Sequence, residues 1–172
     1  MRTWWVVANE RGASGGWHWR EFLGLSNRSR RPYVWGGSHW IRSARSLVNV
    51  RAMRRGDLVV AYQAAEGIVG FAGLHAGGFM RDGAGGSNAF RLNPLRRIGL
   101  INPVRLDAIR PLPGARETFE FLSFSQGSVF TVAPGGSARL ALLAAAFNPL
   151  QTEAILSCAR LSRVEDLGLE SG

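Results

Sequence analysis

Residues that could hold a nucleobase are concentrated in the first quarter of the chain. Trp35 lies within residues 30–40, RRPYVWGGSHW, in a chain with six tryptophans. The glycines after Trp35 would leave its ring face open and let backbone amides approach a ligand. A flat ring stacks on a base with about 1–3 kcal/mol per base. The segment therefore predicts a pocket for an unpaired or flipped base. The alternative is that Trp35 packs in the core.

Arginine supplies all of the positive side-chain charge. The chain has 21 arginines, no lysine and 12 acidic residues, which gives a net charge of +9. Residues 1–110 hold 17 of the arginines and 6 acids, whereas residues 111–172 hold 4 arginines and 6 acids. This basic body predicts a polyanionic partner, although a solvated basic surface without a partner is the alternative. We expect phosphate contacts from Arg28, Arg30, Arg31 and Arg42.

The sequence gives little support for catalysis. The three histidines, His18, His39 and His75, have no spacing to one another, to cysteine or to carboxylates that suits a metal. Cys158 lies among apolar residues, which favours a buried structural thiol over a nucleophile. No phosphate-binding loop motif is present. We therefore predict no catalytic residue, no metal and no cofactor.

Apolar runs and turn residues predict an α+β domain. We expect strands at Thr3–Ala8, Leu58–Tyr62, Ile68–Leu74, Pro103–Pro111, Phe119–Phe124 and Ser128–Val132. We expect helices at Trp17–Leu23, Ser43–Met53, Ala138–Phe147 with Ser137 as a possible cap, and 151–161. Ser26–Pro32 and the glycine-rich Gly77–Asn93 are predicted as loops, the second functional or mobile because of its length. At least one of Trp4 and Trp5 should face the core.

The length favours one domain at residues 1–160 and a C-terminal tail at 161–172. Strands interrupted by helices predict a small mixed β-barrel with flanking short helices. We expect no membrane span, because no run of about 18 apolar residues occurs. A single cysteine and no recognisable signal peptide favour a reduced, cytoplasmic setting.

Four segments in this order resemble the EVE domain and the related YTH domain of the PUA-like superfamily. They are WWVVANE at 4–10, VWGGS at 34–38, MRRGDLVVAY at 53–62 and GIVGFA at 67–72. The most specific part is Gly-Asp-Leu-Val-x-x-Tyr followed by Gly-Ile-Val-Gly-x-Ala. The segment FSQGSVF at 124–130 also matches in position. The resemblance covers roughly residues 1–148.

The resemblance implies a PUA-like barrel that holds a nucleobase, often a methylated or otherwise modified one, in an aromatic pocket. Trp35 would be one wall of the pocket, Asn9 would bond the base edge, and Ser38 would contribute a backbone or hydroxyl contact. A second wall would come from the long loop, at Phe90 or Phe79. The full set of expected base-binding residues is Asn9, Trp17, Trp35, Gly36, Gly37, Ser38, Phe79 and Phe90.

Three functions remain open from the sequence. The first is a reader of a modified base in DNA or RNA, and the resemblance allows an association with restriction or RNA-modification machinery. The second is a general PUA-like RNA-binding module without base discrimination. The third is an RNA-processing enzyme on the same scaffold, with His39 or His18 as the acid–base group.

Overall fold

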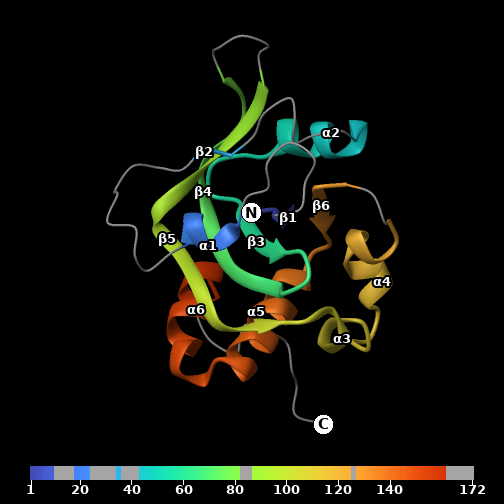
Figure 1. Ribbon diagram of the computed structural model, residues 1–172, viewed down its shortest axis with the longest axis vertical. Coiled ribbons are helices and arrows are strands. Elements are labelled where there is room, and N and C mark those ends of the chain that lie inside the picture. Colours follow the sequence, from blue (N-terminus) through green and yellow to red (C-terminus); the bar gives the residue numbers. More distant parts are fainter. Residues whose placement is uncertain (10–17, 24–33, 36–42, 82–86, 125–126, 162–172) are drawn as a thin grey trace.

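The computed structural model describes residues 1–9, 18–23, 34–35, 43–81, 87–124 and 127–161. The strands are β1 (Thr3–Ala8), β2 (Val34–Trp35), β3 (Leu58–Gln63), β4 (Gly67–Arg81), β5 (Ser87–Val104) and β6 (Val129–Val132). They form one sheet in the order β2-β5-β4-β3-β1-β6. β1 and β3 are parallel, and the other neighbouring strands are antiparallel. Figure 1 shows β4 and β5 as a long curved hairpin.

Within the described ranges, six α-helices and two short 3-10 turns surround the sheet. The α-helices are α1 (Trp19–Leu23), α2 (Ala44–Ala52), α3 (Leu106–Ile109), α4 (Ala115–Thr118), α5 (Gly136–Phe147) and α6 (Thr152–Ala159), and the 3-10 turns are η1 (Glu120–Leu122) and η2 (Pro149–Gln151). No helix in these described parts of the chain is long and apolar enough to cross a bilayer.

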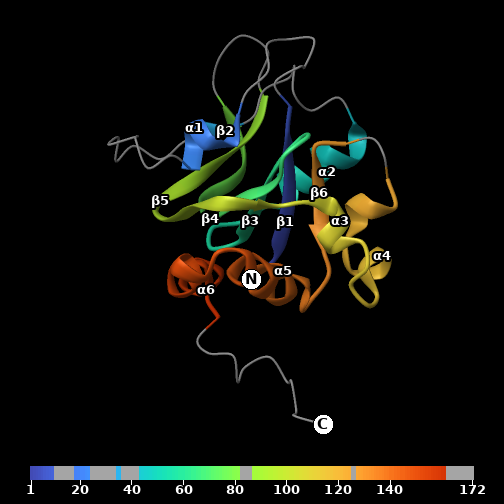
Figure 2. The same ribbon diagram turned by 60° about the horizontal axis from the view of Figure 1, so that its bottom comes forward.

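The sheet separates two apolar cores, and β1 supplies a tryptophan to each of them. Successive side chains of a strand point to opposite faces, so Trp5 enters the core that contains residues of α5 and α6. Trp4 enters the second core, which contains residues of α1 and α2. Figure 2 shows these two helix pairs on opposite sides of the sheet. Both tryptophans are buried, so the expectation that at least one faces the core is confirmed.

Helix α2 bridges distant parts of the curved sheet. It contacts β6 at one edge and also β4 and β5 near the other edge. The edge strands β2 and β6 do not pair with each other among the described residues, so the sheet is open there. The α+β class predicted from the sequence is therefore confirmed, and the helices cover both faces of the sheet.

The Gly-Asp motif that precedes β3 has a structural role. Asp57 is buried, and its Oδ1 accepts the Arg2 amide at 2.9 Å. Its Oδ2 accepts the Trp4 indole N–H at 2.9 Å and the Arg54 amide at 3.0 Å. Hydrogen bonds to an ionised group are among the stronger ones in proteins. This carboxylate therefore joins the start of β1 to the turn before β3.

Several predicted elements are confirmed. The predicted strand Thr3–Ala8 is β1, and the strands predicted at Leu58–Tyr62 and Ser128–Val132 correspond to β3 and β6. The helix predicted at Ser43–Met53 is α2, with Ser43 as its N-cap. The two C-terminal helices correspond to α5 and α6.

The predicted loop Gly77–Asn93 is wrong over most of its length. β4 continues to Arg81 and β5 begins at Ser87. The glycines in this stretch allow a close approach of backbones, because a Cβ on Gly77 would lie 2.7 Å from the Met53 Cβ. The expectation that this stretch is a functional or mobile loop rested on its length as a loop, and it therefore does not apply to the residues that form β4 and β5.

Two predicted strands and one predicted cap are also wrong. Within Pro103–Pro111, β5 ends at Val104 and a helical turn, α3, buries Ile109. Within Phe119–Phe124, only Phe119 makes a β-bridge, to Val132, and η1 follows it. Ser137 lies inside the first turn of α5, whose N-cap is Gly135 and has no side-chain bond.

Candidate functional site

The carboxyl ends of β1 and β3 lie together because the two strands are parallel. Ala8 pairs with Gln63, and the Ala64 amide donates to the Ala8 carbonyl at 2.8 Å. Asn9 follows directly and is exposed. The predicted base-edge residue therefore stands at the surface, at an end of the sheet where further segments are anchored.

The first of these segments begins at His18 and leads into α1. The Trp19 amide donates to Gln63 Oε1 at 3.0 Å, and the Trp19 indole N–H donates to the Val6 carbonyl at 2.9 Å. Gln63 and Trp19 are both buried. Asn9 and His18, which flank residues 10–17 in the sequence, therefore lie on the same pair of strand ends.

The second segment is the start of α2, which is anchored through Ser128. The Val7 amide donates to the Ser128 carbonyl at 2.8 Å. The Ser128 amide donates to Ser46 Oγ at 2.9 Å, and the Ser46 amide donates to Ser43 Oγ at 3.1 Å. These bonds hold Ser43, which follows residues 36–42, near the end of β1. We call Asn9, His18, Ser43 and Ser128 together the β1 end.

A histidine–carboxylate–arginine cluster lies at the β1 end. His18 Nε2 is 2.5 Å from Glu66 Oε1, and the Arg20 amide donates to His18 Nδ1 at 2.9 Å. Because Nδ1 accepts this hydrogen bond, it carries no proton. The ring proton is therefore on Nε2, which donates to Glu66. The Arg20 guanidinium is 3.2 Å from Glu66 Oε2.

The surroundings of Glu66 favour its ionised form. Burial alone would raise its pKa, but the hydrogen bonds of His18 and Arg20 and the positive charge of Arg20 outweigh that effect and lower the pKa below its ordinary value. This cluster could not be predicted from the sequence, because no local spacing connects residues 18 and 66 before the fold is known.

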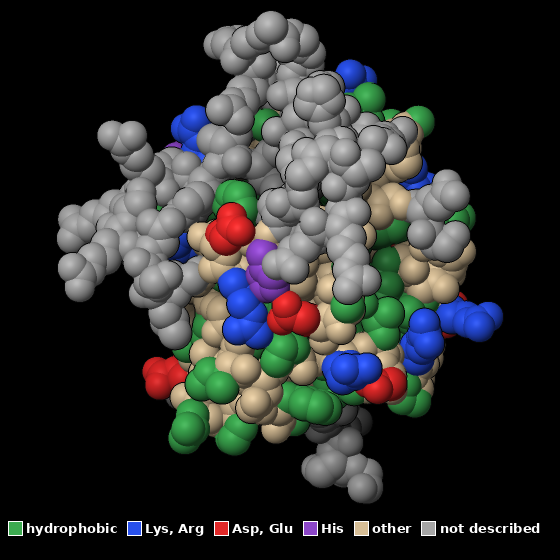
Figure 3. All heavy atoms as spheres, viewed as in Figure 1, with side chains coloured by type: hydrophobic (Ala, Val, Ile, Leu, Met, Phe, Trp, Pro, Cys, Tyr) green, Lys and Arg blue, Asp and Glu red, His purple; other side chains and the backbone are tan. Residues whose placement is uncertain are grey.

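A shallow hollow of about 330 Å³ adjoins this cluster. Tyr62 and Glu66 line one part of it, and Arg105 and Arg110 line another. The Tyr62 ring stacks on Trp5 with 4.9 Å between ring centroids. Burial raises the pKa of Tyr62, and the charges of Arg110 and Arg105 offset part of that rise. Figure 3 shows that basic and acidic side chains are interspersed on the face it views.

The aromatic residues predicted as pocket walls lie in β2, β4 and β5. Trp35 in β2 pairs with Phe90 in β5, and Phe79 in β4 pairs with Ala89. Phe90 is fully buried in the core that also contains Trp4. The prediction of Phe90 as a pocket wall is therefore corrected: its ring packs against the core and has no exposed face for a ligand.

The remaining predicted site residues lie outside the described residues. They are Trp17, Gly36, Gly37 and Ser38 for the base, Arg28, Arg30, Arg31 and Arg42 for phosphates, and His39 for the enzyme alternative. The structure does place the neighbours of two of these segments, because Asn9, His18 and Ser43 converge on the β1 end. No group of three or more metal-ligating side chains occurs in the part of the chain that is described.

Two solved structures share the fold. The NMR structure of Rpa0253 from Rhodopseudomonas palustris aligns with a TM-score of 0.59 and 21% identity, covering 86% of this chain and 96% of that protein. The crystal structure of Atu2648 from Agrobacterium tumefaciens aligns with a TM-score of 0.55 and 18% identity, covering 94% and 92%. No protein-family model and no curated protein matches the chain.

Proposed function

We propose that this protein is a nucleic-acid-binding domain that holds a modified base, such as a methylated one, at the β1 end. The observation that carries the proposal is the convergence of Asn9, His18 and Ser43, which are far apart in the sequence, through the hydrogen bonds of Gln63 and Ser128. His18 and Ser43, which directly follow the segments 10–17 and 36–42 with predicted base-binding residues, thereby lie near an exposed asparagine.

The chemistry of Asn9 fits the edge of a base. Its amide offers two N–H donors and one carbonyl acceptor, which match the mixed donors and acceptors of a base edge. A methyl group adds only about 0.8 kcal/mol through burial. Discrimination therefore has to come from the shape of the pocket and from polar groups that lose partners with the wrong base.

The PUA-like scaffold is part of the same proposal. The sheet curves so that α2 contacts strands near both of its edges, as expected for a barrel that is incompletely closed. The segments resembling EVE and YTH domains include β1, β3 and the start of β4. Strand β3 begins directly after the Gly-Asp motif, whose carboxylate joins it to β1.

The decisive measurement is binding to matched oligonucleotides. Single- and double-stranded DNA and RNA, with and without methylated cytosine or adenine, are compared at one salt concentration. We expect at least a tenfold preference for one modified base, which corresponds to about 1.4 kcal/mol. Trp35→Ala should abolish this preference, because stacking contributes about 1–3 kcal/mol per base.

Arg116→Gln provides the control, since Arg116 lies in α4 and is exposed. It should leave the preference unchanged. Equal binding to every oligonucleotide would replace the base reader by the general RNA-binding module. The burial of Phe90 favours testing this second candidate directly, because it removes one of the two residues expected as a second wall.

The third function, an RNA-processing enzyme, receives no support from His18. Its two ring nitrogens contact the Arg20 amide and the Glu66 carboxylate. In this arrangement the ring orders the start of α1. His39, the other acid–base candidate, lies outside the described residues.

A further inference from the structure

Five arginines converge on the turn at Gly56 and Asp57, at the amino ends of β1 and β3. Arg54 and Arg55 precede the turn, and the Arg2 amide donates to Asp57 Oδ1 at 2.9 Å. The Arg96 guanidinium donates to the Gly56 carbonyl at 2.8 Å. A Cβ built on Gly56 would lie 3.9 Å from the Arg160 guanidinium. We call these five residues the Gly56 arginine cluster.

The positive charge of the cluster is poorly balanced. Asp57 is the acidic residue of the turn, but it is buried and its oxygens already accept three N–H groups. None of the five arginines forms an ion pair with an acidic side chain among the described residues. Burial and the neighbouring charge of Arg160 lower the pKa of Arg96. The repulsion between these like charges therefore lowers the stability of the folded state.

The fold uses only part of this cluster. The Arg54 guanidinium donates to the carbonyls of Arg51 and Met53 at 2.8 and 2.9 Å and thereby caps the end of α2. The Arg96 guanidinium also donates to the Cys158 carbonyl at 2.7 Å. These two side chains have structural partners that account for their positions.

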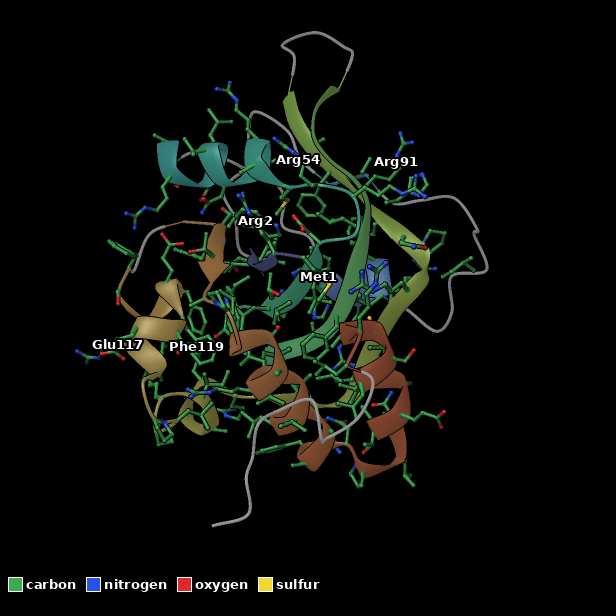
Figure 4. All side chains as sticks on the ribbon, turned by 180° about the vertical axis from the view of Figure 1, so that it is seen from behind. Met1, Arg2, Arg54, Arg91, Glu117 and Phe119 are labelled. Atoms are coloured by element: carbon green, nitrogen blue, oxygen red, sulfur yellow. The ribbon has the colours of Figure 1, made fainter. Side chains whose placement is uncertain are left out.

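The side chains of Arg2, Arg55 and Arg160 are different. All three residues are exposed, and their guanidiniums make no hydrogen bond or ion pair within the described residues. Figure 4 shows Arg2 and Arg54 in this region, between α2 and the C-terminal helices. Three exposed arginines around one turn can offer guanidiniums to phosphate oxygens, which guanidiniums bind through paired N–H groups.

We propose that the Gly56 arginine cluster is a second nucleic-acid contact, which binds the sugar-phosphate backbone without reading its sequence. This inference rests on the proposed function, because it assumes a nucleic-acid ligand. β3 begins beside the cluster and ends at the β1 end. Six residues at about 3.3 Å each separate the two contacts by about 20 Å. Only a ligand of sufficient length can reach both.

The test compares a trinucleotide with a 20-nucleotide strand that carries the same preferred base. Stacked nucleotides advance about 3.4 Å each along a strand, so the trinucleotide cannot span the two contacts. The wild type should bind the long strand more tightly and with a steeper dependence on salt. In Arg55→Gln/Arg160→Gln, the slope of log K against log salt for the long strand should fall by about 1.4, because each phosphate contact on a single strand contributes about 0.7.

The matched control is Arg116→Gln/Arg139→Gln, which removes the same charge from exposed positions on α4 and α5. This control should keep the wild-type slope of log K against log salt, and it should still bind the 20-nucleotide strand more tightly than the trinucleotide. Arg55→Gln/Arg160→Gln should leave the melting temperature unchanged, because these two guanidiniums make no hydrogen bond or ion pair within the described residues.

The outcomes separate the two proposals. Equal losses in both double variants, or no gain with length in the wild type, would overturn the second contact even if a base preference is found. A cluster-specific loss without any base preference would support the second contact and overturn the modified-base reader. Absence of binding to every oligonucleotide would overturn both.

Discussion

Glu66 ties the turn between β3 and β4 to the start of α1, and its ionisation should be visible in the stability of the protein. Its folded-state pKa lies below the ordinary value of 4.5. The carboxylate therefore stabilises the folded state above about pH 4.5, and this contribution is lost as the pH falls through the lowered pKa. We expect the difference in unfolding free energy between the wild type and Glu66→Gln to be largest at pH 7 and to shrink toward pH 3.

Urea denaturation at pH 7, 5 and 3 measures this difference. Asp107→Asn is the matched control, because the Asp107 carboxylate is 74% exposed and lies 3.5 Å from Arg105. Exposed pairs of this kind contribute little, so its effect should be small at every pH. A Glu66→Gln effect that grows as the pH falls would contradict the roles assigned to His18 and Arg20.

Single residues were predictable from the sequence to different degrees. Asn9 follows a strongly apolar run, so its position at the end of a strand could be predicted, and it is exposed as the proposed role requires. Phe90 could not be placed, because nothing local distinguishes an aromatic residue in a loop from one in a buried strand. The partners of His18 and Asp57 depend on strand order and were equally inaccessible.

At the scale of elements, the pairing of β4 with β5 depends on the glycine that begins β4, because the last residue of β5 lies beside it. Gly67 begins β4 with a φ of +124°, and a Cβ there would lie 2.3 Å from the Val104 carbonyl oxygen. We expect Gly67→Ala to lower the unfolding free energy by more than about 2 kcal/mol, because backbone strain adds to the clash. The midpoint of urea denaturation measures the loss.

The variant Gly135→Ala distinguishes backbone strain from the steric clash. The φ of Gly135 is +81°, but a Cβ there would meet nothing within 4 Å. Gly135→Ala should therefore show only the backbone term, about 1–2 kcal/mol. A Gly67→Ala loss no larger than that of Gly135→Ala would mean that the hairpin adjusts to the extra atom.

The elements that the sequence predicted well are those whose residues agree with their surroundings. β1 and β3 are mostly apolar runs and are buried on both faces, and α2 begins directly after the serine that caps it. The wrong predictions concern segments in which tertiary contacts, and not the local sequence, determine the secondary structure. Glycines at 77 and 78 indicated a loop, yet they allow β4 to pass closely over Arg51 and Met53. The alternation in Pro103–Pro111 resembled a strand, yet α3 occupies part of it.

At the scale of the whole molecule, the reactivity of Cys158 reports on opening of the core that contains residues of α5 and α6. It is the single cysteine of the chain, and it lies in α6 against that core. Burial raises its pKa to about 11, and the charge of Arg96 offsets part of the rise. We expect modification by a thiol reagent at pH 8 to be at least about 100-fold slower than in the unfolded chain, because the thiolate is the reactive form.

Labelling followed across a urea series measures this protection. The rate should rise in step with global unfolding, as monitored by tryptophan fluorescence. Rapid labelling in native buffer would show that α6 separates from the sheet on its own, and the core that contains residues of α5 and α6 would then be less cooperative than the packing of its helices indicates.

The position of β1 in the sheet has a consequence for how the protein is made. Thr3 pairs with Leu58 on one side and with Val132 on the other. A ribosome adds about 5–20 residues each second, so on the order of ten seconds pass between synthesis of β1 and synthesis of its second partner. During that interval Trp4 and Trp5 belong to a strand with an unpaired edge. Of the described strands, β1 is made before the others but completes its hydrogen bonds only when β6 is made, and a chain that stalls before β6 exposes the unpaired edge of an apolar strand to chaperones and to other nascent chains.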